Sequence, residues 1–191
     1  TTWSRGLGDV YKRQISTPDH MHAIQAIAAM QRGINVYVQK PLTHNIRETR
    51  MLTEMARENK IVTQMGNQGA SNSGMTKVQE WFNDGKIGTV DEVFVWTNRP
   101  VWPQGIPVPK PTGSSSPDHL DWDLWLGTAP SIPYSDAYHP FNWRGWWAYG
   151  TGALGDMGCH IIDVPFKTLG LHYPTAVAVS YTHLTLPTNL S

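Results

Sequence analysis

The chain has 191 residues, of which 40% are hydrophobic, and its 15 basic and 15 acidic side chains give a formal net charge of zero. This length allows one well-packed core or two small ones. The balanced charge argues against a nucleic-acid-binding surface, and no apolar run approaches the length of a membrane span. One cysteine, Cys159, excludes an internal disulfide and fits a reducing compartment. We therefore expect a soluble globular protein.

Both ends of the chain carry related short segments. Residues 9–14 (DVYKRQ) and 179–184 (VSYTHL) can be encoded by one DNA element read in opposite orientations, which resembles a transposon-end adaptor of sequencing libraries. We therefore expect residues 1–14 and 179–191 to be non-native scars. On this interpretation residues 15–178 are an internal portion of a longer protein, and the chain as written is inactive.

The first half of the remaining chain alternates between strand and helix patterns. A buried strand that ends near Ile15 turns at Pro18 into a helix that Gly33 stops. Further elements are expected as a strand at 35–38, an amphipathic helix at 46–59 with Ile46, Leu52, Met55 and Ala56 buried, and a strand at 61–65. This order indicates crossovers in a parallel sheet, and we predict the C-terminal half of a doubly wound Rossmann domain over residues 15–66.

The second half is rich in aromatic residues, with six of the nine tryptophans between Trp102 and Trp147. A helix is predicted at 75–84, and the alternating pattern of 89–97 predicts a strand. A compact aromatic element follows at 121–127, and a helix is expected to run from 152 to 169. The tryptophans suit either a core or the face of a sugar, with a core the more frequent use.

Turns that follow the predicted strands carry polar residues. The segments 16–22, 39–42 and 66–68 each follow a strand, and in open parallel sheets ligands bind beyond the carboxyl ends of the strands. No glycine-rich phosphate-binding turn of the form G-x-G-x-x-G occurs between residues 15 and 65. That turn would belong to an earlier strand and helix of the same domain.

The stretch 151–163 (TGALGDMGCHIID) combines glycines with three titratable side chains. If it is helical, Asp156, His160 and Asp163 lie on one face at i, i+4 and i+7. A carboxylate beside an imidazole makes a candidate proton donor or acceptor, because histidine titrates nearest neutral pH. A polar helix face that meets only water is the alternative. The glycines favour the first interpretation, since they are costly in a helix unless another segment or a ligand approaches closely.

Three motifs together resemble the Gfo/Idh/MocA family of nicotinamide-dependent oxidoreductases. They are TPDHMH at 17–22, QKPL at 39–42 and GDMGCHIID at 155–163, and the resemblance covers essentially all of residues 15–178. The family implies an α/β fold: a partial Rossmann domain at 15–66, which binds NAD or NADP, and an incomplete α/β substrate domain at 67–178 with a mostly antiparallel sheet. It also implies hydride transfer between the nicotinamide and a sugar or polyol carbon.

The resemblance assigns roles to individual residues. Lys40 matches the family's lysine at the nicotinamide ribose and the reacting hydroxyl, and Asp156 and His160 match the pair at the substrate, with His160 as proton acceptor. The cofactor-binding residues that it implies are Thr17, Pro18, His22, Gln39, Lys40 and Asn67. Gln39 stands where the family usually has glutamate, which removes a negative charge and keeps hydrogen-bonding capacity. We further expect a homo-oligomer in the cytoplasm or periplasm. The balanced charge leads us to expect no nucleic-acid or membrane partner.

Several alternatives stay open at this point. Some proteins of this fold are NAD-dependent glycosidases that use transient oxidation, and a non-catalytic binding protein is a third possibility. His20 and His22 could ligate a metal, although no metal site is expected from their spacing. Lys40 could be a surface lysine of a turn, and Arg144 could bind an anionic substrate or close a buried ion pair.

Overall fold

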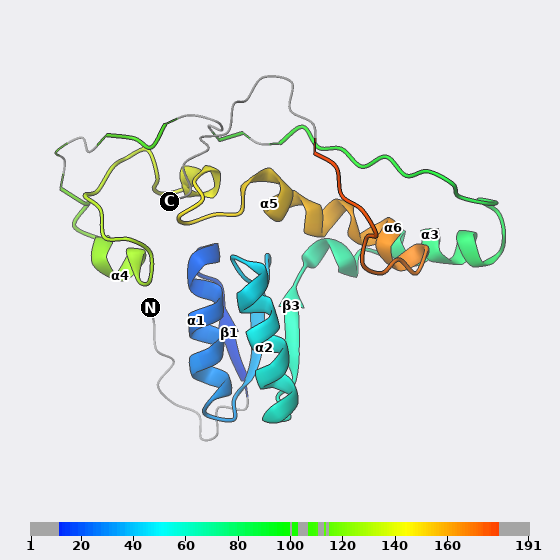
Figure 1. The fold of residues 1–191 in the computed structure, drawn as a ribbon, viewed down its shortest axis with the longest axis horizontal. Coiled ribbons are helices and arrows are strands. Elements are labelled where there is room, and N and C mark those ends of the chain that lie inside the picture. Colours follow the sequence, from blue (N-terminus) through cyan, green and yellow to red (C-terminus); the bar gives the residue numbers. More distant parts are fainter. Residues whose placement is uncertain (1–11, 100, 103–106, 111–112, 114, 180–191) are drawn as a thin grey trace.

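The computed structural model describes residues 12–99, 101–102, 107–110, 113 and 115–179. Its centre is a parallel sheet of three strands in the order β1-β2-β3. The strands are β1 (Lys12–Ile15), β2 (Asn35–Gln39) and β3 (Thr63–Gly66). The register places Ile15 beside Val38 and Gln39 beside Gly66, so the carboxyl ends of all three strands meet at one edge (Figure 1). The predicted parallel sheet is confirmed, and β1 begins ahead of the boundary predicted at residue 15.

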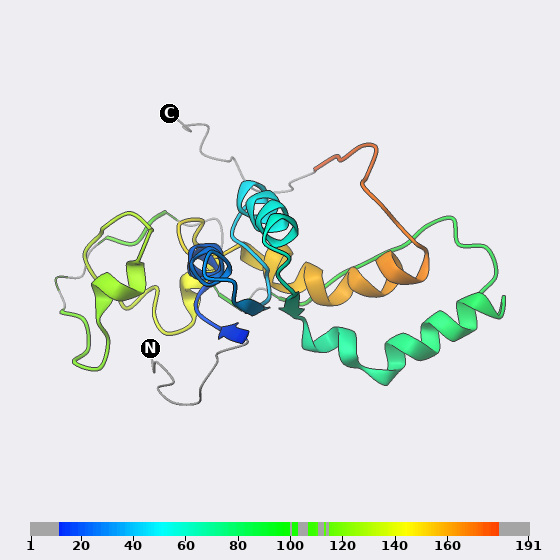
Figure 2. The ribbon, with the colours of Figure 1, turned by 90° about the horizontal axis from the view of Figure 1, so that it is seen from below.

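Helices α1 (Asp19–Met30) and α2 (Ile46–Glu58) cover the same face of this sheet (Figure 2). The sheet and the two helices enclose one hydrophobic core, which consists of Ile15, Ala26, Ala29, Met30, Val36, Val38 and Leu52. Removal of these apolar side chains from water is the main force that holds the helices against the strands.

Helix α2 shows why its sequence folds as predicted and where the prediction was wrong. Asn45 caps the helix: its side chain accepts a hydrogen bond from the Glu48 backbone N–H at 3.0 Å, and the Glu48 carboxylate accepts one from the Asn45 N–H at 3.3 Å. Leu52 is buried, but Ile46, which was expected in the core, is 75% exposed. Six residues separate the two, and at 3.6 residues per turn this spacing places them on different faces.

The chain after β3 contains only helices and irregular segments in its described part. These helices are η1 (Gln68–Ser71), α3 (Ser73–Asn83), α4 (Trp122–Leu126), η2 (Asn142–Gly145), α5 (Gly152–Ile161) and α6 (Asp163–Thr168). The strand expected at 89–97 is not formed, because no described segment pairs with it. The mostly antiparallel sheet is accordingly absent from the described residues. None of the helices described is long and apolar enough to cross a membrane.

The single helix expected from 152 to 169 is two helices that meet at Ile162. Pro165 gives the physical reason, because proline has no backbone N–H to donate to the carbonyl of Ile161 four residues earlier. Helix α5 lies across the carboxyl ends of the strands, and α6 continues toward α3 (Figure 1).

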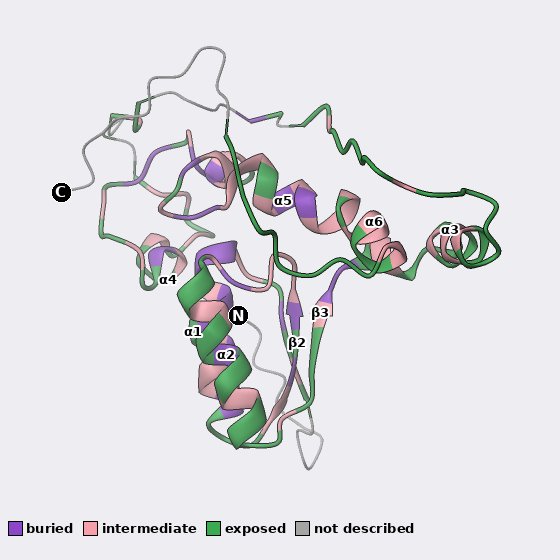
Figure 3. Ribbon diagram, turned by 45° about the vertical axis from the view of Figure 1, so that its right-hand side comes forward, coloured by how far each residue is buried: buried purple, intermediate pink, exposed green. Residues whose placement is uncertain are grey.

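A second core of aromatic side chains lies beside the amino end of α1. It consists of Leu126 and four aromatic residues, Tyr138, Trp143, Trp146 and Tyr149. Figure 3 shows buried stretches of the ribbon near α4 and at the end of α1 nearest to α5. The rings meet mostly edge to face, as between Tyr138 and Trp146 with centroids 5.0 Å apart. The structural interpretation of the tryptophans therefore holds for Trp143 and Trp146, whereas Trp147 is 75% exposed.

The contrast between the two α2 residues gives a stability prediction. Leu52→Ala should lower the free energy of unfolding by about 2–5 kcal/mol, because it leaves a cavity between α2 and the sheet. Ile46→Ala removes an exposed side chain and should change it by about 0.5 kcal/mol or less. Urea unfolding of the whole protein and of both variants measures the two values, and equal effects would contradict the packing described for α2.

Candidate active site

The site is centred on an ion pair between the sheet and helix α5. Lys40 follows β2, and its Nζ lies 2.6 Å from Oδ1 of Asp156 on α5, 116 residues further along the chain. The same Nζ donates a hydrogen bond to the Asp156 backbone carbonyl at 3.0 Å. Both side chains are largely buried, with 14% of Lys40 and 7% of Asp156 exposed. The interpretation of Lys40 as a surface lysine is therefore wrong.

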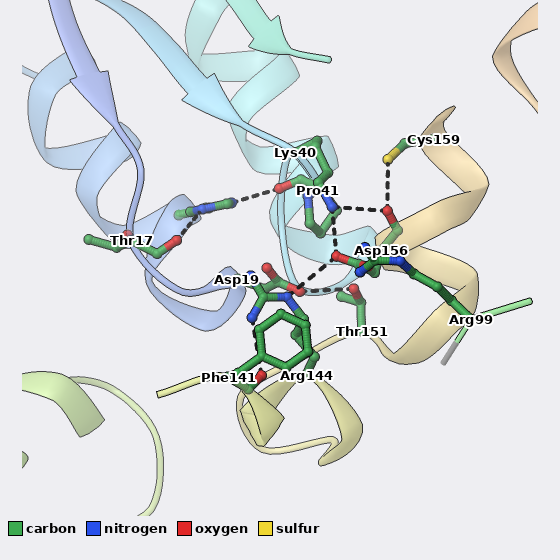
Figure 4. Close-up of polar contacts among 11 residues, drawn as sticks. Thr17, Asp19, Lys40, Pro41, Arg99, Phe141, Arg144, Thr151, Asp156 and Cys159 are labelled. Carbon is green, nitrogen blue, oxygen red and sulfur yellow. Dashed lines mark hydrogen bonds and ion pairs between the residues drawn. The ribbon is translucent and has the colours of Figure 1, made fainter. Parts of the chain in front are cut away.

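Two arginines share the carboxylate of Asp156. Nε of Arg144 lies 3.6 Å from Oδ1, and Nη1 of Arg99 lies 3.9 Å from Oδ2 (Figure 4). Arg144 comes from η2, and Arg99 from the extended segment after α3. Three cationic side chains thus surround one carboxylate, so positive charge is in excess around Asp156. The sequence suggested a buried ion pair or an anion site for Arg144 but gave no signal for Arg99.

A cavity of about 350 Å³ opens beside the ion pair. Its wall combines the turns after β1 (16–19) and β2 (39–40), aromatic residues of α4 and of segment 139–144, and Asp156. The lining residues are Ser16, Thr17, Pro18, Asp19, Gln39, Lys40, Trp125, His139, Pro140, Phe141, Trp143, Arg144 and Asp156. Of the residues predicted from the sequence, Thr17, Pro18, Gln39, Lys40 and Asp156 are brought together here.

His22 does not line this cavity but fixes the two turns that do. Its ring is 1% exposed, with Nδ1 2.6 Å from the carbonyl oxygen of Pro41 and Nε2 2.7 Å from that of Thr17. The ring therefore links the turn after β1 to the turn after β2. His22 acts on the cavity through the position of these backbones.

The two ring nitrogens of His20 also face backbone carbonyls. Its Nε2 lies 3.1 Å from the carbonyl oxygen of Trp125, and its Nδ1 lies 3.3 Å from that of Tyr149. Because both ring nitrogens of His20 and of His22 face backbone carbonyls, nothing in this geometry supports the pair as metal ligands. Within the described residues, no three side chains of His, Cys, Asp or Glu gather as a metal-binding set.

Asp19 is a second carboxyl group in the cavity wall, and the sequence analysis missed it. It is buried, and Oδ2 accepts a hydrogen bond from the Thr151 hydroxyl at 2.9 Å. Burial raises the pKa of Asp19, and the Thr151 hydrogen bond opposes that shift only in part. The available signal was its position inside the TPDHMH motif, directly after Pro18.

His160 lies one turn beyond Asp156 on α5, outside the cavity wall. A Cβ placed on Gly69 would lie 3.2 Å from its Nδ1, so Gly69 allows this close approach. Burial lowers the pKa of His160, and the positive charge of Lys40 lowers it further against the opposing effect of Asp156. Asp163, predicted on the same face, instead begins α6 and pairs with Lys167 at 3.0 Å.

Asn67 supplies an unsatisfied polar atom at the same edge of the sheet. Its amide nitrogen donates to the Cys159 carbonyl of α5 at 2.6 Å, while its Oδ1 is buried and has no hydrogen-bond partner within the described residues. Buried acceptors are normally paired. An amide or hydroxyl group of a ligand would satisfy this oxygen. This acceptor and the strand-end turns of the cavity lie at the edge where open parallel sheets bind their ligands.

Comparisons with known proteins agree with this architecture. One curated relative is a levoglucosan dehydrogenase from Pseudarthrobacter phenanthrenivorans, 24% identical over 163 residues, which make up 85% of this chain and 34% of the relative. This chain thus spans about a third of that protein. Among solved structures, GenD2 from gentamicin A biosynthesis, in complex with NAD, is 21% identical, with 84% of this chain and 36% of GenD2 covered and a TM-score of 0.52.

A second solved structure aligns over a smaller part of the chain. It is an inositol dehydrogenase homolog from Azotobacter vinelandii with NADH and myo-inositol, 26% identical, with 41% of this chain and 21% of that chain covered and a TM-score of 0.40. Two domain models of one family match consecutive parts of the sequence. Residues 13–67 match the "NAD-binding Rossmann fold" of the oxidoreductase family, and residues 93–181 match its "C-terminal alpha/beta domain". The chain therefore belongs to the Gfo/Idh/MocA family of oxidoreductases.

Proposed function

We propose that the whole protein transfers hydride between NAD and the CH–OH carbon of a sugar or polyol. The observation that carries this proposal is the buried ion pair of Lys40 and Asp156 at the wall of the strand-end cavity. It presents an ammonium group where a dinucleotide-binding sheet places its ligands. His160 follows Asp156 by one turn of α5, which adds an imidazole near the same position.

The proposed reaction assigns one task to each of these groups. Bound NAD supplies the hydride acceptor. Loss of hydride from an alcohol carbon requires that the hydroxyl proton be accepted, and an ammonium nearby stabilises the developing alkoxide. Lys40 is that ammonium, held in place by Asp156. His160 is the proton acceptor, because its lowered pKa keeps the ring neutral and able to take a proton at neutral pH.

The hydrogen bonding of His160 supports this role. In the described part of the chain its ring has no hydrogen-bond partner, whereas His20, His22 and His44 all have ring nitrogens at backbone carbonyls. A ring without a partner is free to exchange a proton with a ligand. Thr17, Pro18, Gln39 and Asn67 would hold the cofactor in this proposal.

The substrate class is supported by the family and by one relative. The family's amino-terminal domain is an NAD-binding one, and the curated relative is named a dehydrogenase of levoglucosan, which is a sugar derivative. The aromatic side chains of Trp125 and Phe141 in the cavity wall suit the apolar face of a sugar ring.

Replacement of His160 tests the proposed proton acceptor. His160→Ala in the whole protein should lower kcat for sugar oxidation by about 10²–10⁴, as expected for loss of a general base, while NAD still binds. Formation of NADH measures the first and fluorescence titration the second. His172→Ala, in an exposed position, is the matched control and should change neither. Turnover of a glycoside without net NADH formation would instead point to hydrolysis.

The pH dependence of the same reaction tests the direction of the pKa shift. Because oxidation requires neutral His160 and its folded pKa lies below the ordinary 6.5, kcat/KM should fall only as pH drops through a value below 6.5. Between that pH and neutral pH, kcat/KM should not change with pH. An acid limb centred above pH 6.5, or the same limb in His160→Ala, would contradict the assignment.

A further inference from the structure

The side chain of Arg144 is held in the cavity wall by several contacts. Its guanidinium lies over the rings of Trp143 and Phe141, with its Cζ 4.3 Å and 4.6 Å from their centroids. Nη1 donates a hydrogen bond to the Phe141 carbonyl at 3.1 Å, and Nε faces Asp156 at 3.6 Å. About a quarter of the side chain, 26%, is exposed, so it remains accessible from the cavity.

The backbone around Arg144 is fixed by close packing. A Cβ placed on Gly150 would lie 2.5 Å from the Cα of Arg144, so only glycine permits this approach of the two segments. The neighbouring Trp143 is buried in the aromatic core. Arg144 is therefore oriented before any ligand binds, which reduces the entropy lost when it forms a contact.

The charges around Arg144 leave its guanidinium only partly compensated. Asp156 is closest to Lys40, at 2.6 Å, while the two arginines stand 3.6 and 3.9 Å away. Asp19 is the other carboxyl group in the wall; burial raises its pKa, and the positive charge of Arg144 acts against that rise. Arginine carries five N–H donors. Within the described residues, no partner is found for the Nη2 group of Arg144.

We propose that Arg144 recognises an anionic group on the substrate, so that the protein acts on an acidic sugar such as a uronic or aldonic acid. The planar guanidinium matches a carboxylate with two parallel hydrogen bonds. The aromatic rings beneath it exclude water from one side and strengthen the attraction. This inference rests on the proposed function, because it names the substrate class of the same cavity.

Matched pairs of sugars test this anion recognition in the whole protein with NAD. Each pair consists of an acid and its neutral counterpart: glucuronate with glucose, galacturonate with galactose, and gluconate with sorbitol. Glucose 6-phosphate is tested separately, to show whether the recognised group is a phosphate or a carboxylate. We expect kcat/KM for the anionic member of at least one pair to exceed that of its neutral partner by about tenfold or more. Calorimetric titration of the same compounds measures binding without reaction.

Variants of Arg144 connect this preference to one side chain. Arg144→Met should abolish the preference, mainly through a higher KM for the acid. Arg144→Lys should retain part of it, because the charge remains and the planar fork is lost. Arg57→Met, on the exposed surface of α2, makes the same substitution far from the cavity and should leave the preference unchanged.

The outcomes separate this inference from the proposed function. Equal use of acid and neutral sugars, or a preference that survives Arg144→Met, would overturn anion recognition and leave hydride transfer intact. Tighter binding of acids without any NADH formation would overturn hydride transfer and leave anion recognition intact. A stronger preference for glucose 6-phosphate would assign the anionic group as a phosphate, and absence of binding by every anion would overturn the inference.

Discussion

The ion pair of Lys40 and Asp156 joins the two parts of this protein. Lys40 is fixed by its position after β2, and Asp156 belongs to a helix that has no strand to hold it in place. A carboxylate that is 7% exposed needs a cationic partner, because an uncompensated buried charge costs several kcal/mol. The pair therefore fixes the position and orientation of α5 at the carboxyl edge of the sheet. The shape of the neighbouring cavity depends on this placement.

Three histidines support the same arrangement through contacts with backbone carbonyls. His22 joins the turns after β1 and β2, His20 joins α1 to the aromatic core, and His44 lies 3.2 Å from the Gly150 carbonyl before α5. A neutral imidazole has one N–H donor, so each ring can donate to one of the backbone carbonyls that it faces. These side chains allow irregular segments to have defined positions around the cavity.

The sequence predicted the parts of the structure that depend on local pattern. The alternation of strands and helices up to Gly66, the amphipathic helix α2 and the polar turns at the strand ends all follow from spacing and turn residues. The prediction was wrong for a strand whose formation depends on a neighbouring strand. The alternating pattern of 89–97 describes a half-buried strand, but a strand also needs a partner, and no described segment provides one.

The candidate site shows the same division between local and long-range information. Lys40, Asp156 and His160 could be found because their motifs are contiguous in sequence. Arg99 could not, because its importance arises from its contact with Asp156, 57 positions further along the chain (156 − 99). Asp19 lies within the TPDHMH motif, but the sequence does not show its contact with Thr151, 132 positions away. Such pairings are set by the packing of whole elements, which a single sequence does not reveal.

The positive charge around Asp156 connects the fold to the chemistry. Two carboxyl groups, Asp156 and Asp19, face three cationic side chains, Lys40, Arg99 and Arg144, so the site keeps a positive potential. That potential favours an alkoxide over an alcohol and a neutral imidazole over a charged one. The excess of positive charge therefore stabilises the product of proton removal, and burial together with the charge of Lys40 lowers the pKa of the proposed acceptor, His160.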